Sequence, residues 1–297
     1  MGLFLVAIGL LAIYLFNFYY VQRRKLPPGP IPLPFVGNSL SFIKTPLDVC
    51  LQKWKDQYGD IMTIWVGCVP TVTLHNSRVI YDTFVKDGDA YAGRMELSWN
   101  EIVRSGPLGV MFAEGPLWRE HRRFALQVFR NLGLGRNIMQ ERVLDDVCAL
   151  ISHVKSEAAS GKTEVNMFDE LDIAIGSVIN SITFGYRFSR ENRSEFKRVK
   201  KIATEAVSFF NSFLYRVMDG RINLLRRLPF FKDVYEANVN HNNESREFFL
   251  GQVDAHLKNI DLDSDEEPSD YVEAYLRMQH KLDKEGVKHT YRFVVLL

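Results

Sequence analysis

The sequence predicts a mainly α-helical protein with one small β hairpin, carried behind a single transmembrane anchor helix. Three observations support this fold class. The segment Leu3–Val21 is apolar and uncharged, a proline-rich stretch follows it, and most of the remaining chain repeats its apolar residues at helical spacing. Only two short segments, within residues 60–76, alternate as strands do. With 46% hydrophobic residues over 297 positions, the chain has enough apolar material for a sizeable core.

The amino-terminal segment is expected to cross a membrane. As a helix, Leu3–Val21 measures about 28 Å, close to the thickness of a bilayer's hydrocarbon layer. Three basic residues, Arg23–Lys25, follow the segment and none precedes it, so the rest of the chain is expected to face the cytosol. A cleaved signal peptide has a basic start and a small-x-small cleavage site, and neither is present. Residues 1–22 are therefore predicted to be an uncleaved signal anchor.

Residues 23–44 form a basic, proline-rich hinge in this interpretation. Prolines stand at positions 27, 28, 30, 32 and 34. Proline fixes φ and lacks an N–H group, so this stretch is expected to be a stiff, polyproline-like spacer. Its P-x-x-P pattern also fits an SH3 ligand. A spacer that holds the body at a set angle to the membrane is the interpretation we favour.

The body, residues 45–297, is expected to be helical around one hairpin. Pro46 suits the first turn of a helix that ends at Gly59. The segments 60–67 and 70–76 alternate as strands, and a helix is expected over 78–85. The acidic run 261–270 is interpreted as a solvated loop. Longer amphipathic stretches follow the hairpin at about 137–157, 166–184, 191–214, 231–258 and 268–282.

Charge and cysteine usage exclude several classes of protein. A formal net charge of +1 argues against a nucleic-acid-binding protein, which needs a basic excess. Cys50, Cys68 and Cys148 are widely spaced, so they predict neither a disulfide framework nor a metal knuckle. His121 and His241 stand alone in the sequence and are expected to be surface histidines.

The stretch GPLWREHRRFAL, residues 115–126, is the candidate binding motif. On a helix, Trp118 and Arg122 are neighbours at i and i+4, and Arg119 and Arg123 form a second such pair. An indole N–H donates one hydrogen bond, and a guanidinium grips a carboxylate with two. Trp118 and Arg122 therefore suit the carboxylate of a cofactor. An exposed basic helix remains the alternative, since W-x-x-x-R is weak evidence by itself.

Five features occur in one order: the anchor, PPGPIPLPFVGN, a hairpin after YGDI, WREHRRF, and SITFGYRF at 181–188. Together they resemble the amino-terminal half of microsomal cytochrome P-450 monooxygenases, in the branch that oxidises xenobiotics, steroids and fatty acids. The resemblance covers essentially the whole chain. It implies a single-pass protein of the endoplasmic reticulum membrane with a cytosolic body, small lipophilic substrates, and NADPH-cytochrome reductase as a partner.

The resemblance also implies a haem cofactor and assigns residues to it. Trp118 and Arg122 would hold its propionates, and Arg94, in YAGR, matches a further propionate-binding arginine of that branch. The segment 95–113 corresponds to the variable loop over the haem. The candidate substrate contacts are Val110, Met111 and Phe112 in that loop and Phe209, Phe210 and Phe213 in the roof helix of the pocket. The spacing of these phenylalanines fits core packing equally well.

The chain departs from the family pattern at its end, KHTYRFVVLL, where the family's long central helix begins. The 297 residues contain neither the family's E-x-x-R pair in the expected place nor its F-x-x-G-x-x-x-C-x-G loop, which supplies the thiolate ligand of the iron. No catalytic residue or metal ligand is therefore assigned. We expect a truncated P-450 catalytic domain without activity by itself. The alternative is a non-catalytic, membrane-anchored helical protein or splice product that binds partners through its basic surface.

Overall fold

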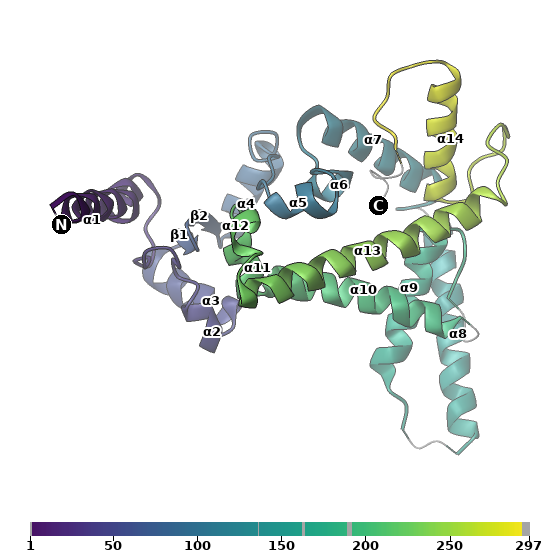
Figure 1. Ribbon diagram of the computed structural model, residues 1–297. Helices are drawn as coiled ribbons and strands as arrows, with labels where there is room; N and C mark the ends of the chain where they lie inside the picture. The colour runs from purple at the N-terminus through teal and green to yellow at the C-terminus, as the bar shows by residue number, and fades with distance from the viewer. Residues whose placement is uncertain (1, 136, 162–163, 189–191, 293–297) are drawn as a thin grey trace. The chain divides into compact units, whose positions relative to one another are not determined.

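The computed structural model describes residues 2–135, 137–161, 164–188 and 192–292. The chain divides into two compact units, Met1–Gly93 and Arg94–Leu297. Over the described residues the protein is mainly helical, with one antiparallel pair of strands and an apolar amino-terminal helix (Figure 1). The predicted fold class is confirmed.

The first unit contains the anchor helix, the hairpin and several short helices. Helix α3 ends at Tyr58 and is followed by Gly59, the residue at which the sequence predicted the helix to stop; Gly59 has a positive φ of 96°. The elements of this unit, in order, are α1 (Gly2–Phe16), the π-helical turn η1 (Asn17–Val21), the 3₁₀ turn η2 (Gln22–Lys25), α2 (Ser41–Lys44), α3 (Leu47–Tyr58), β1 (Ile61–Val66), β2 (Val69–Leu74), α4 (Ser77–Tyr81) and the π-helical turn η3 (Asp82–Lys86).

The hairpin pairs β1 with β2 over their whole length, from Ile61 opposite Leu74 to Val66 opposite Val69. A two-residue turn joins the strands, and Gly67 adopts the left-handed φ of 62° that such a turn requires. Strand β1 is buried on both faces, whereas most of β2 is exposed. The hairpin therefore serves as a support for other segments of this unit.

One helix among the described residues, Leu5–Lys25, is long and apolar enough to cross a membrane, with a mean hydropathy of 1.7. Its last turns pack on the hairpin. The Tyr19 ring lies 5.3 Å from that of Trp65, and the Tyr19 hydroxyl donates to Cys68 Sγ at 3.2 Å and accepts from the Phe35 N–H at 2.8 Å. Tyr19 is thus fully buried at the end of an otherwise exposed apolar helix.

The proline-rich segment lies along β1. The Thr63 N–H donates to the Pro28 carbonyl at 2.9 Å, and the Trp65 N–H donates to Asn38 Oδ1 at 2.8 Å. A Cβ at Gly29 would lie 1.9 Å from the Thr63 carbonyl oxygen, so only glycine permits this approach. Hydrogen bonds to the hairpin hold the spacer in place.

The second unit is built from ten helices within its described residues. Helices α8 and α9 lie side by side, as do α10 and α13 (Figure 1). In order, the helices are α5 (Ser98–Val103), α6 (Gly109–Phe112), α7 (Gly115–Asn131), α8 (Asn137–Ala159), α9 (Met167–Thr183), α10 (Arg193–Asn211), α11 (Phe213–Met218), α12 (Ile222–Leu225), α13 (Pro229–Leu257) and α14 (Tyr271–Lys284).

Aromatic clusters hold several helices of the second unit together. Phe124 and Val128 of α7 pack with Tyr275 of α14 and with Tyr291 in the segment after it. Trp99 of α5 is fully buried, stacks on the Tyr215 ring at 4.6 Å and donates its indole N–H to the Tyr215 carbonyl. Each cluster joins segments that are far apart in the sequence.

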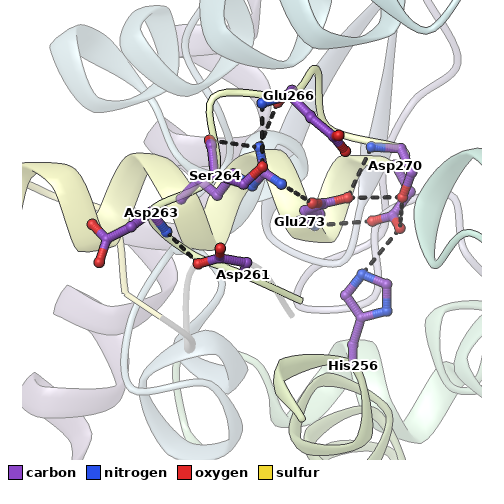
Figure 2. A network of polar contacts seen from close by, with 9 residues as sticks. His256, Asp261, Asp263, Ser264, Glu266, Asp270 and Glu273 are labelled. Atoms are coloured by element: carbon purple, nitrogen blue, oxygen red, sulfur yellow. Dashed lines mark hydrogen bonds and ion pairs between the residues drawn. The ribbon is translucent and has the colours of Figure 1, made fainter. Parts of the chain in front are cut away.

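The acidic run 261–270 is only partly the solvated loop that was expected. Its last residue, Asp270, is completely buried. The Arg277 guanidinium of α14 donates to the carbonyls of Ser264 and Glu266 and forms an ion pair with Glu273 (Figure 2). These bonds tie the loop to the first turns of α14. The expectation fails at Asp270, because an acidic side chain can be buried where helix N–H groups satisfy it.

Candidate functional site

Helix α7 presents two different faces. His121, Phe124, Ala125 and Val128, spaced at i, i+3, i+4 and i+7, are buried. Trp118, three residues before His121, lies at the edge of this stripe and is half-buried, whereas Arg119, Arg122 and Arg123 are exposed. Pro116 lies in the first turn, where its missing N–H costs no helical hydrogen bond. The buried stripe therefore orients the helix, so that Trp118 lies at the edge of the core and the arginines of the motif point toward solvent.

Three residues predicted to bind the cofactor lie together in the structure. The Arg122 guanidinium carbon lies 5.1 Å from the centre of the Trp118 ring, and that of Arg94 lies 5.4 Å from it. Trp118 is half-buried, whereas both arginines are exposed. Each guanidinium is within cation–π distance of the indole ring. The Trp118 ring therefore contacts both positive charges.

The chain before α7 fixes the position of Arg94. Its backbone N–H donates to Glu114 Oε2 at 3.0 Å, and its side-chain Nε donates to the Met111 carbonyl at 3.2 Å. These partners are Met111 in α6 and Glu114, the residue just before α7. Arg94 lies outside α7, so the spacing of residues within that helix could not predict its contact with Trp118.

The Trp118 indole and the Arg122 guanidinium keep their hydrogen-bonding capacity. Within the described residues, no carboxylate forms an ion pair with Arg122 or Arg123, and no acceptor binds the Trp118 indole N–H. An indole donor beside guanidinium forks is a receptor for carboxylate oxygens. The donor set therefore fits the propionates of a haem.

The loop 95–113 contains the short helices α5 and α6, and its candidate substrate contacts differ in exposure. Val110 and Met111 are exposed, Met111 by 71%. The Phe112 ring stacks on that of Phe210 of α10, with 6.3 Å between ring centres. The structure thus brings together one candidate from the loop and one from the expected roof helix.

The remaining candidates are placed differently. Phe209 packs in the cluster around Trp99 and Tyr215, and its ring lies 5.3 Å from that of His241. Phe209 thus packs in the core, which is the alternative to substrate contact that the spacing of the phenylalanines left open. The side chain of Phe213 lies outside the described residues.

Both solitary histidines are buried, so the expectation that they lie at the surface was wrong. His121 is 2% exposed, and its Nε2 lies 3.0 Å from Thr290 Oγ1; burial lowers the pKa of its imidazole. His241 is 8% exposed, and its Nδ1 lies 3.0 Å from Glu205 Oε2. The signal for His121 was present in the sequence, because it belongs to the apolar stripe of α7.

The three cysteines do not fit the role of a haem-iron ligand. Cys50 is buried, and its thiol donates to the carbonyls of Ser41 and Thr45. Cys68 accepts the hydroxyl of Tyr19 and donates to the Phe35 carbonyl, and Cys148 is exposed on α8. In the part of the chain that the structure describes, no three His, Cys, Asp or Glu side chains form a metal-binding group.

Comparisons with known proteins identify relatives over most of the chain. The family model described as cytochrome P450 matches residues 27–293. Cytochrome P450 2C7 of Rattus norvegicus is 30% identical over 261 residues, which are 87% of this chain and 50% of that protein. Cytochrome P450 2C25 of Mesocricetus auratus is 30% identical over 255 residues, covering 86% and 50%.

A more distant relative extends the same match. The probable cytochrome P450 cyp-35D1 of Caenorhabditis elegans is 27% identical over 299 aligned residues, which cover 97% of this chain and 58% of that protein. The chain spans about half the length of the curated relatives that it matches.

Proposed function

Because the chain belongs to the cytochrome P450 family, we propose that it is part of a haem-dependent monooxygenase that oxidises small lipophilic substrates. The convergence of Arg94 and Arg122 on the Trp118 ring carries this proposal. Haem, when bound, supplies the iron at which dioxygen is activated. The guanidinium groups of Arg94 and Arg122 and the indole N–H of Trp118 would hold its propionates.

The apolar residues near this site supply the contacts to substrate. Phe112 and Phe210 present stacked rings, and Val110 and Met111 present exposed aliphatic surface. Apolar side chains of this kind exclude water and favour lipophilic ligands over polar ones. Xenobiotics, steroids and fatty acids are the substrate classes that we propose.

The protein is proposed to reside in the endoplasmic reticulum membrane with its body in the cytosol. The apolar helix Leu5–Lys25 and the basic residues Arg23–Lys25 at its end support this orientation. The exposed guanidinium of Arg123, the residue after Arg122 in α7, suits an acidic surface of NADPH-cytochrome reductase.

We propose further that these 297 residues by themselves do not carry out monooxygenation. Oxygen activation in this family needs a strong thiolate donor on the iron. The contacts of Cys50 and Cys68 and the exposed position of Cys148 suit none of them for that role. The purified chain, given haem and reductant, should show no thiolate-type carbon-monoxide difference spectrum. A normal thiolate spectrum would refute this part of the proposal.

The propionate role is tested by comparing haem with its dimethyl ester, in which both carboxylates are neutral. The full chain in lipid nanodiscs is titrated with each compound, and binding to empty nanodiscs is subtracted. The unmodified chain should prefer haem to the ester. Arg122→Gln should reduce this preference about tenfold, because a charge-assisted hydrogen bond contributes about 1.5–3 kcal/mol.

Arg123→Gln is the matched control, since it removes a neighbouring guanidinium that does not contact the Trp118 ring. It should keep the preference of the unmodified chain. Equal binding of haem and its ester to the unmodified chain would show that the propionates are not recognised, and α7 would then be an exposed basic helix.

A further inference from the structure

Glu114 contacts the backbones of two residues of the candidate haem site. Its carboxylate oxygen Oε2 accepts the Arg94 N–H at 3.0 Å, and its carbonyl oxygen accepts the Trp118 N–H at 3.4 Å. The side chains of the same two residues are also in contact, since the Arg94 guanidinium carbon lies 5.4 Å from the centre of the Trp118 ring. Glu114 therefore ties together the two chain segments that form this cation–π pair.

Glu114 stands at a position where a side chain usually serves its own helix. It is the N-cap residue of α7, yet its side chain makes no capping hydrogen bond to that helix. Ser, Thr, Asp and Asn are preferred at such a position because their short side chains reach the N–H groups of the first turn. The longer glutamate side chain bonds instead to Arg94, 20 residues earlier. Gly115, whose left-handed φ of 61° suits glycine, then turns the chain into α7.

The bond between Glu114 and Arg94 closes the loop 95–113, because the two residues stand at the two ends of that loop. Arg94 Nε donates to the Met111 carbonyl at 3.2 Å, close to the same end. One bond therefore holds the backbone of Arg94 and the other holds its side chain, so together they direct the guanidinium toward the indole of Trp118. Without the bond to Glu114, the backbone at position 94 gains conformational freedom and the guanidinium has a less defined place.

From these contacts we propose that Glu114 is a positioning residue for haem binding, which acts by fixing where the Arg94 guanidinium lies. It acts through Arg94 rather than directly, because its own carboxylate repels the carboxylates of an anionic ligand. This inference rests on the proposed function, since it concerns one of the groups that are proposed to hold the propionates. A residue with the wrong charge for the ligand is thus expected to strengthen binding of that ligand.

The test repeats the titration with haem and its dimethyl ester on two variants of Glu114 in nanodiscs. Glu114→Ala removes both the charge and the hydrogen-bond acceptor, whereas Glu114→Gln removes the charge and keeps an acceptor oxygen on a side chain of the same length. The preference for haem over the ester should be at least about threefold lower in Glu114→Ala than in Glu114→Gln. Because both variants lose the same charge, this difference reports the hydrogen bond. Equal preferences in the two variants would overturn the inference.

A double-mutant cycle tests whether Glu114 acts through Arg94. In the Arg94→Gln background the guanidinium is absent, so Glu114→Ala and Glu114→Gln should show the same preference for haem. A difference as large as that in the unmodified background would mean that Glu114 acts by another route, and the proposed role would be wrong. Glu101→Ala is the matched control, since it removes an exposed carboxylate of the same loop, in α5. It should keep the preference of the unmodified chain.

Hydrogen–deuterium exchange of the haem-free chain gives a second readout, which does not depend on haem binding. Loss of the bond to Glu114 releases one end of the loop, so peptides within residues 94–113 should exchange faster in Glu114→Ala than in Glu114→Gln. Peptides from α14 should exchange alike in both variants, which would show that the rest of the fold is unchanged. Equal exchange of the loop peptides in the two variants would show that this bond does not hold the loop.

The titration of the unmodified chain keeps the two proposals separate. If that chain prefers haem to the ester but the two Glu114 variants do not differ in this preference, only the inference about Glu114 fails. If that chain binds haem and the ester equally, the proposed haem site fails, and the positioning role fails with it even where the loop peptides exchange differently.

Discussion

The carboxylate of Asp270 lies 3.0 Å from Nε2 of His256 and so joins α14 to α13. Its other oxygen, Oδ1, accepts the Glu273 N–H at 2.9 Å and caps the amino terminus of α14. Glu273 in turn accepts the N–H and hydroxyl of Ser269 at 2.8 and 2.7 Å (Figure 2). One buried side chain therefore begins a helix and connects it to another.

Asp270→Ala should destabilise the protein strongly. The substitution removes the cap of α14 and leaves the His256 ring without its carboxylate. Loss of an aspartate cap costs about 0.5–2 kcal/mol, and buried groups left without their hydrogen-bond partner cost about 1–3 kcal/mol more. Urea unfolding of the full chain in detergent micelles, followed by far-ultraviolet circular dichroism, measures this loss. Asp265→Ala, at an exposed position of the same acidic run, should change the free energy of unfolding by less than about 0.5 kcal/mol. Similar values for the two variants would contradict the role of Asp270.

The same carboxylate explains the glycine in SITFGYRF. Gly185 has a left-handed φ of 76°, and a Cβ there would lie 2.6 Å from Asp270 Oδ2. Gly185→Ala should therefore cost more than the usual backbone penalty of about 1 kcal/mol. Gly220→Ala is the matched control, since Gly220 has a φ of 75° and a Cβ there would have no heavy atom within 4 Å. The difference between the two free energies of unfolding isolates the clash, and no difference would show that Asp270 moves aside freely.

Sequence periodicity predicted the local features of the site but not its long-range contacts. The i, i+4 spacing placed Trp118 beside Arg122, as the structure confirms. The approach of Arg94 to the same ring follows from hydrogen bonds to Met111 and Glu114, which no periodic pattern encodes. The resemblance, by matching YAGR, named Arg94 without predicting its contact.

The sequence pattern wrongly predicted that several polar residues would be exposed to solvent, whereas they are buried. Asp270 stands in a run of charged residues whose composition favours solvent, yet the Glu273 N–H binds its Oδ1 and the Ser269 hydroxyl binds its Oδ2. His241 is buried because Glu205, on another helix, lies beside its ring. A partner such as Glu205 comes from a distant segment, so only the folded structure reveals it.

His121 should make the fold less stable in acid. Burial lowers the pKa of its imidazole below the ordinary value of 6.5, although Glu120 nearby opposes this effect. Its other neighbours are the Thr290 hydroxyl and the rings of Tyr275 and Tyr291. As the pH falls through 6.5, the unfolded chain gains a proton that the folded chain does not take up, and the free energy of unfolding decreases.

The test compares the free energy of unfolding at neutral pH and at a pH of about 5. His121→Gln removes the titrating group and should lose less stability between these two conditions than the unmodified chain. Phe124→Leu, a non-titrating change in the same core, should lower stability by a similar amount at both. If His121→Gln keeps the full pH dependence, other groups cause it.

Cys148 offers a direct test of the proposed orientation in the membrane. It is exposed on α8, whereas Cys50 is buried. The basic residues Arg23–Lys25 follow the apolar helix, so the body should lie on the cytosolic side. A membrane-impermeant maleimide added to sealed microsomes should therefore label the chain without detergent, and Cys148→Ser should remove most of that label. Because the reagent does not enter the lumen, labelling that appears only after the vesicles are opened would place Cys148, and the helical body that carries it, on the lumenal side.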